Sequence, residues 1–210
     1  MATLLISDID GVLCDSVSAA LRWVWDRYRV IVPYARITRY EMEFPIAAVL
    51  REAGVEIAPD RIAEELSALC WRNPAHYHLS RPDFDLWHAL QRWQSSGRPL
   101  QFATRREAHL RHVTGGWLTD HGFDLDGDGQ SLPGGRPLVM HADKLGLAQT
   151  ACSHHDRVIF IEDALHYAKP VAEQSEAEVW VPEQPWNAGS LPRRATRLRS
   201  AEIARRLLEL

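Results

Sequence analysis

The sequence of 210 residues has little lysine, few cysteines and no basic excess. Lys144 and Lys169 are the only lysines among 24 basic residues, and the net charge is −4 at pH 7. Proteins that bind duplex nucleic acid mainly through phosphates usually carry a basic excess, so this charge disfavours a nucleic-acid partner. The three cysteines are widely spaced and form neither a disulfide framework nor a CxxC metal pair, which fits a reducing compartment.

A long apolar run is also absent. The N-terminal run Leu4-Leu5-Ile6 is far too short for a membrane span and lacks the basic region of a secretory signal. We therefore expect a cytoplasmic protein without a membrane partner. Nothing in the composition indicates an oligomeric state.

The scarcity of lysine has a simple cause, because a GC-rich genome favours arginine codons. Under such drift, a lysine that persists indicates a position where arginine does not serve. Lysine is a compact point charge, whereas arginine is a wide planar fork. Lys144 is therefore a residue of interest before any motif is considered.

Apolar runs alternate with helical patterns through most of the chain. Such alternation predicts an α/β protein with a doubly wound, mainly parallel sheet. The predicted strands are Thr3–Ile9, Pro99–Thr104, Pro137–Met140, Arg157–Asp163 and Glu178–Pro182. The predicted helices between them are Asp83–Ser96, Arg106–His121, Ala142–Cys152 and Ala164–Ser175.

The alternation stops between residues 16 and 81, where the pattern is helical throughout. Ser16–Arg29, Pro45–Ala53 and Pro59–Arg72 are its clearest helical segments. We predict that 16–81 form a helical cap inserted after the first strand, and that 1–15 and 82–210 form the α/β core. The tail Pro192–Leu210 is predicted to be an arginine-rich helix, which is either a solvated face or a patch for nucleic acid or another partner.

Two carboxylates follow the first predicted strand. Asp8 and Asp10 lie two residues apart at the end of an apolar run, and Gly11 follows them. Buried carboxylates are costly unless a cation or a ligand compensates them, and ligands bind at the carboxyl edge of open α/β sheets. At this spacing one carboxylate can attack a substrate while the other transfers a proton.

Three further strand ends carry candidate residues. Thr104 ends the second strand, where its hydroxyl could bind a phosphate oxygen or simply cap the next helix. Lys144 follows the third strand, and Glu162-Asp163 end the fourth. Carboxylates from the first and fourth strands can share a divalent cation, of which Mg²⁺ is the best match to oxygen ligands. Together these groups predict a phosphoryl-transfer site.

The order of these motifs resembles the haloacid-dehalogenase-like (HAD) superfamily of phosphohydrolases over nearly the whole chain. The signature DxDG(V/T)L is present from Asp8 to Leu13, and Thr104, Lys144 and Glu162-Asp163 match the other motifs. The resemblance implies that Asp8 is the nucleophile and Asp10 the general acid and base. It also implies that Mg²⁺ is bound by Asp8, the Asp10 carbonyl and Asp163. Glu162 would support these ligands without contacting the metal itself.

A closer resemblance is to the deoxyribonucleotidase-like (5′-nucleotidase) branch, whose helical cap is also inserted after the first motif. The matching segments are Ala103–Arg106, Thr114–His121, Phe160–Ala164 and Val181–Asn187, where Trp186 stands in place of a tyrosine that is frequent in the branch. Arg105 in the first of these is a candidate for substrate binding.

The predicted cap is rich in aromatic residues. Most of them are expected to pack within a small helical bundle. One or two could instead face the cleft and stack on a base. We select Phe44, Trp71 and Tyr77, because they lie in loops or at helix ends, where a cap would meet its substrate.

The sequence therefore predicts a Mg²⁺-dependent phosphomonoesterase that acts on a nucleoside 5′-monophosphate or a similar small phosphate ester. Two alternatives remain. A polynucleotide 3′-phosphatase could share the core and use the arginine-rich tail, although the cap would crowd a nucleic-acid strand. A non-catalytic nucleotide-binding or scaffold protein could also have this fold.

Overall fold

The computed structural model describes residues 3–125, 132 and 136–210. Six strands form one sheet in the order β5-β4-β1-β6-β7-β8, and all neighbouring pairs are parallel. The strands are β1 Thr3–Ser7, β4 Leu100–Ala103, β5 Leu138–Val139, β6 Arg157–Ile161, β7 Glu178–Pro182 and β8 Ala195–Leu198. The mainly parallel α/β fold is confirmed.

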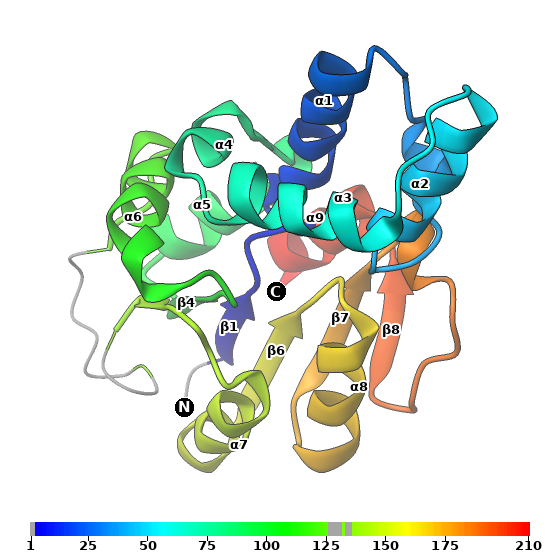
Figure 1. Cartoon of the computed structure of the whole chain (residues 1–210). Helices are drawn as coiled ribbons and strands as arrows, with labels where there is room; N and C mark the ends of the chain where they lie inside the picture. The colour runs from blue at the N-terminus through cyan, green and yellow to red at the C-terminus, as the bar shows by residue number, and fades with distance from the viewer. Residues whose placement is uncertain (1–2, 126–131, 133–135) are drawn as a thin grey trace.

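Alternate residues of the central strands point to opposite faces of the sheet, and helices cover both faces. Leu5 and Ile159 lie in the same apolar cluster as side chains of α5 Phe84–Ser95, α6 Arg111–Asp120 and α9 Ser200–Glu209. Leu4 and Phe160 lie in a second cluster with side chains of α7 Lys144–His154 and α8 Leu165–Gln174, which lie together on one face (Figure 1). Because both faces are covered, the central strands β1, β6 and β7 are largely apolar.

The strand order changes direction at β1. The chain adds β4 and β5 on one side of β1, and then β6, β7 and β8 on the other side. In open α/β sheets, ligands usually bind beyond the carboxyl ends of the two neighbouring strands between which the strand order reverses, here β1 and β6. Ser7 pairs with Ile161 at the ends of β1 and β6, so Asp8 and Glu162 leave the sheet side by side.

The segment between Asp15 and Arg81 is largely helical and lies above the strand ends in Figure 1. It contains α1 Ser16–Tyr28, η1 Tyr34–Arg36, α2 Glu43–Glu52, α3 Pro59–Leu66, the π-helical turn η2 Ser67–Trp71 and α4 Pro74–Leu79. These helices pack around their own apolar cluster, which includes Val24, Ile46 and Ile62. Two short antiparallel strands, β2 Cys14–Asp15 and β3 Arg81–Pro82, bring the two ends of this segment together.

The prediction for the tail was wrong, because Pro192–Leu210 is not one helix. Ala195–Leu198 form the edge strand β8, which pairs in parallel with β7, and only Ser200–Glu209 are helical. The arginines in this tail are largely engaged within the chain. Arg194 pairs with Glu176, and Arg205 and Arg206 both pair with Glu202.

Two further turns of helix bear on the site, η3 Ala108–Leu110 after β4 and η6 Pro185–Asn187 after β7. Within the described residues, every helix is too short or too polar to span a bilayer.

Candidate active site

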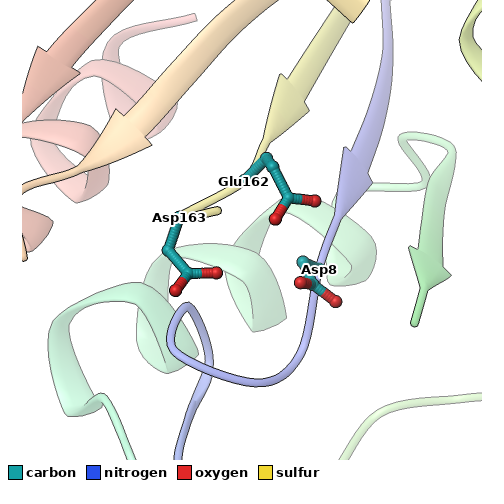
Figure 2. Close-up of side chains that lie close together, drawn as sticks. All are labelled: Asp8, Glu162 and Asp163. Atoms are coloured by element: carbon teal, nitrogen blue, oxygen red, sulfur yellow. The ribbon is translucent and has the colours of Figure 1, made fainter. Parts of the chain in front are cut away.

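Three buried carboxylates converge at the carboxyl edge of the sheet. Asp8 follows β1, and Glu162 and Asp163 follow β6; each of the three offers an oxygen within 4.8 Å of those of the other two (Figure 2). The Asp8 side chain is fixed by the backbone N–H of Ile9, which donates to its Oδ1 at 2.7 Å. The parallel register of β1 and β6 thus brings together residues that are far apart in the sequence.

Lys144 is the cation of this cluster. Its Nζ donates to Asp8 Oδ2 at 2.7 Å and to Glu162 Oε2 at 2.5 Å, and its side chain is only 2% exposed. The ring of Tyr167 lies 4.8 Å from the same nitrogen. Burial alone would lower the pKa of Lys144, but the two carboxylates outweigh burial and raise it. Lys144 therefore stays charged.

One lysine does not balance three carboxylates. Burial raises the pKa of Asp8 to about 7, although Lys144 acts in the opposite direction. Burial, and then the charge of Asp8, raise the pKa of Asp163 to about 7 as well. A second positive charge at this place would relieve the repulsion, and the all-oxygen donor set suits Mg²⁺. The residues present therefore fit a divalent cation.

Asp163 is held in place by the segment after β7. Trp186 Nε1 donates to Asp163 Oδ2 at 2.8 Å, and Asn187 Nδ2 donates to the Asp163 backbone carbonyl at 3.0 Å. On its other side Asp163 lies against Gly11, where an added Cβ would come within 2.3 Å of Oδ2. Gly11 also has φ +72, so both space and backbone conformation require glycine there.

Asp10 lies apart from the three-carboxylate cluster and is bound by Arg106. The guanidinium Nε and Nη2 donate to the two Asp10 oxygens, both at 2.8 Å. Burial alone would raise the pKa of Asp10, but the charge and hydrogen bonds of Arg106 outweigh burial and lower it. Asp10 is therefore a carboxylate at neutral pH in this conformation.

Thr104 is buried at the end of β4, where its Oγ1 accepts the backbone N–H of Arg106 at 3.2 Å. In this arrangement its hydroxyl caps the turn that carries Arg106. Arg105 lies between Thr104 and Arg106 in the sequence, and its Nη1 donates to the Ala142 carbonyl at 3.1 Å.

A cavity of about 440 Å³ opens between the helical segment and the sheet edge. Of the residues predicted from the sequence, Asp10, Arg105, Trp71, Tyr77 and Asp163 line it. Most of the remaining lining comes from the helical segment, whose apolar and aromatic side chains at the cavity include Val17, Ile37, Tyr40 and Met42. Trp186, in η6 after β7, also lines the cavity. Phe44 is 43% exposed, and its ring packs under Arg39, 4.4 Å from the guanidinium carbon.

Three residues in this region were not predicted as site residues. Arg106 and Trp186 each bind a carboxylate of the site, and Tyr40 lines the cavity with its ring centroid 4.5 Å from that of His166. Nothing in the local sequence distinguishes Arg106 from its neighbour Arg105. For Trp186, the sequence shows only that a tryptophan stands where the resembling branch often has a tyrosine.

No protein-family model and no curated protein sequence matches the chain. Solved structures do match it over almost its full length. A HAD family hydrolase from Deinococcus radiodurans R1, determined with bound phosphate and sodium, has a TM-score of 0.63 and 19% identity over 98% of this chain and 95% of that one. A hydrolase from Pseudomonas syringae has a TM-score of 0.56 and 19% identity over 99% of both chains.

A HAD-superfamily hydrolase of subfamily IA from Geobacter sulfurreducens has a TM-score of 0.54 and 17% identity over 98% of this chain and 96% of that one. At these identities the likeness shows the fold. The chain has the α/β fold of HAD hydrolases, as its motifs predicted. None of these three proteins is described as a nucleotidase, so the nucleotidase branch stays a prediction.

Proposed function

We propose that this protein is a Mg²⁺-dependent phosphomonoesterase that works through an aspartyl-phosphate. The observation that supports this most is the contact of Lys144 with Asp8 and Glu162, beside Asp163, at the carboxyl ends of two neighbouring parallel strands. A fixed carboxylate, a buried cation and further acids are what phosphoryl transfer by a carboxylate needs.

In the proposed reaction, an Asp8 oxygen attacks phosphorus and the bond to the leaving-group oxygen breaks. Asp10, once protonated, gives its proton to that oxygen, so that an alcohol leaves. Water then attacks the phosphorus of the aspartyl-phosphate and gives its proton to Asp10, which releases inorganic phosphate and restores the Asp8 carboxylate. The lowered pKa of Asp10 suits its second task, because a base must start as the carboxylate.

Lys144 and Thr104 are proposed to contact the transferring phosphoryl oxygens. Lys144 already touches Asp8, so it can hold two anions close before the new bond forms. Thr104 Oγ1 accepts the Arg106 backbone N–H, so its own hydroxyl hydrogen can still be donated to a phosphate oxygen. A hydroxyl can donate one bond while it accepts another.

The proposed metal ligands are Asp8, Asp163 and the Asp10 backbone carbonyl. Glu162 supports them indirectly, because it binds Lys144 and the backbone N–H of Ala164. When bound, Mg²⁺ would supply positive charge that offsets the repulsion between Asp8 and a phosphate dianion.

We propose that residues 16–81 act as a cap that selects the leaving group. A cavity of about 440 Å³ with a largely aromatic and apolar lining is larger than a phosphate group requires. Trp71 can stack on a flat group, and Arg105 can pair with an anion. Tyr77 is only 3% exposed and its ring lies against Arg106, so it forms part of the cavity wall instead. These features favour a nucleoside 5′-monophosphate or a phosphate ester of similar size. With three free cysteines, we place the protein in the reducing cytoplasm.

The direct test is a screen of phosphate release across phosphorylated metabolites, with and without Mg²⁺. We expect Mg²⁺-dependent turnover, with mononucleotides among the best substrates. Failure to release phosphate from any ester, including p-nitrophenyl phosphate, would contradict the proposal and would favour a non-catalytic binding protein.

A polynucleotide 3′-phosphatase is disfavoured by a bridge at the cavity. Arg72 of the helical segment pairs with Glu107, which follows β4, at 2.8 Å, and both residues line the cavity. We expect kcat/KM for the best 5′-mononucleotide to exceed that for a 3′-phosphorylated oligonucleotide by about tenfold or more. Initial rates of phosphate release on both substrates give this ratio, and the reverse order would favour the polynucleotide enzyme.

The raised pKa of Asp163 predicts an effect on stability. A carboxyl group with a folded-state pKa of about 7 favours folding at low pH, and this contribution is lost as pH rises toward 7. In EDTA at pH 8, Asp163→Asn should therefore unfold at a higher temperature than the parent, by roughly 2 to 4 °C for each kcal/mol of relieved repulsion. The asparagine oxygen can still accept from Trp186, and the gain should shrink at pH 5 and vanish only below about pH 4, where the carboxyl group is protonated in the unfolded chain as well.

Mg²⁺ supplies the second arm of this experiment. It should raise the Tm of the parent but not that of Asp163→Asn, because the variant lacks a ligand. Asp26→Asn, at an exposed carboxylate on α1, serves as the control and should respond to Mg²⁺ as the parent does. Equal Mg²⁺ responses of parent and Asp163→Asn would remove Asp163 from the metal site.

A further inference from the structure

We infer that the ion pair between Arg72 and Glu107 is a gate that restricts the cavity to compact leaving groups. This inference rests on the proposed phosphatase function and adds to it a size limit and the two residues that set it. Arg72 Nε donates to Glu107 Oε1 at 2.8 Å, and both residues line the cavity. A leaving group that ends inside the cavity leaves this pair closed, whereas a longer one has to separate the two side chains.

The pair lies at the rim of the cavity, where the helical segment meets the sheet-forming part of the chain. Arg72 follows the π-helical turn η2 of the helical segment, and Glu107 precedes η3, which follows β4. The two side chains are 62% and 46% exposed although both residues line the cavity. They therefore stand between its interior and the solvent, and their contact closes this part of the rim.

Local structure fixes the backbone of both partners. The Arg72 N–H donates to the carbonyl of Ser67, five residues earlier, at 3.0 Å, and this bond closes the π-helical turn. Such turns are rare and occur frequently at functional sites. On the other side, the Glu107 carbonyl accepts the Leu110 N–H at 3.0 Å. The two side chains are thus presented to each other from hydrogen-bonded turns.

The contact is suited to opening and closing. His109 lies against both partners, with Nδ1 3.4 Å from Glu107 Oε2 and Nε2 3.4 Å from the Arg72 carbonyl. All three side chains are about half exposed or more. Exposed ion pairs contribute little to stability and are screened by salt. This pair can therefore separate while the rest of the fold stays intact, as a gate requires.

A second contact between the two parts of the chain borders the same cavity. Tyr40 lines the cavity, and its ring centroid is 4.5 Å from that of His166 in α8. Burial and the charge of Lys144 lower the pKa of His166, so this contact is uncharged at neutral pH. It offers another way out for a long leaving group. The two routes can be separated by experiment, because salt weakens the ion pair directly and not the contact between uncharged rings.

The test is a series of phenyl phosphates that carry neutral oligo(ethylene glycol) ethers of increasing length at the para position. The reacting oxygen and its basicity stay the same along the series, so the ratio of kcat/KM between the shortest and the longest member measures discrimination by length. We expect a ratio of about tenfold or more for the parent and of less than about threefold for Arg72→Ala and Glu107→Ala. A residue needed only for folding would lower both rates alike and leave the ratio unchanged, which would overturn the inference.

Exchange of the two charges tests whether pairing itself sets the limit. Arg72→Glu alone and Glu107→Arg alone place like charges together and should keep the ratio low. The double variant re-forms the pair in the opposite sense and should restore the ratio to within about threefold of the parental value. If the double variant does not restore the ratio, pairing does not set the limit and the inference is overturned.

Two further variants serve as comparisons. Glu52→Ala is the matched control and should keep the parental ratio, because Glu52 pairs with Arg36 at 2.7 Å on an exposed surface within the helical segment. Tyr40→Ala tests the second route. If it lowers the ratio while Arg72→Ala and Glu107→Ala do not, long leaving groups exit beside His166 and the inference is overturned.

Salt gives a readout that needs no variant. In the parent the ratio should fall by about twofold or more between about 0.01 M and about 1 M sodium chloride, while in Glu107→Ala it should change by less than that. Effects of salt on phosphate binding cancel in the ratio, because every ester carries the same phosphate group. A parental ratio that does not depend on salt would contradict closure by an ion pair.

Failure of this inference and failure of the proposed function give different results. If the parent releases no phosphate from any member of the series, the proposed function fails, and the gate fails with it. If the parent hydrolyses the short and the long esters with similar kcat/KM, the phosphatase function stands and only the gate is refuted.

Discussion

Replacing Asp8 by asparagine should lower phosphate release by about 10⁴-fold or more, because an amide cannot form the covalent intermediate. Asp8 accepts one bond from the Ile9 backbone and one from Lys144, so the asparagine can satisfy only one of them through its single oxygen. Thermal unfolding should be measured alongside turnover to show that the fold persists. Activity within about tenfold of the parent would contradict the nucleophile assignment.

The identity of the phosphorylated residue can be read directly from a companion variant. Asp10→Asn should slow turnover severely, since both protonation of the leaving group and activation of water need a titrating group. With an activated aryl phosphate it should still form the aspartyl-phosphate and then retain it. Mass spectrometry of the trapped protein should place the phosphoryl group on Asp8, and a label on any other residue would refute the division of roles.

The fold was largely predictable because a parallel sheet covered on both faces leaves a clear pattern in the sequence. β1, β4, β5, β6 and β7 all lie within predicted apolar runs. β8 was missed because it lies at the sheet edge, where only Leu198 of its four residues is buried and Arg197 interrupts the apolar pattern. Arg197 instead binds the carbonyls of Asn187 and Gly189, contacts that depend on the folded chain.

The convergence of the acids was also predictable, since parallel strands end at one edge of the sheet. Sequence order alone places Asp8, Glu162 and Asp163 at that edge. The Arg106–Asp10 pair was not predictable, because 96 residues separate its members and the sequence carries no period that links them. The same holds for Trp186 and Asp163, whose contact requires the turn after β7 to fold back over β6.

Lys144→Ala should lower kcat/KM by about 10³-fold. Repulsion between two unit charges about 4 Å apart amounts to about 4 kcal/mol at an effective dielectric near 20, and each 1.4 kcal/mol corresponds to about tenfold. Without Lys144, this repulsion between Asp8 and an approaching phosphate would be unopposed by the protein. The truncation also leaves Asp8 and Glu162 buried without their partner, so the unfolding temperature of the variant must be measured as well.

Lys144→Arg is the sharper test, because it keeps the charge and changes only its shape. The Nζ atom reaches Asp8 at 2.7 Å and Glu162 at 2.5 Å from a side chain that is 2% exposed, so a wider guanidinium must displace one of these carboxylates. We expect a loss of about 10²-fold in kcat/KM. Lys169→Arg on α8, the other lysine of the chain, is the control and should be nearly silent. Near-parental rates for Lys144→Arg would defeat the argument from shape, and near-parental rates for Lys144→Ala would remove Lys144 from the site.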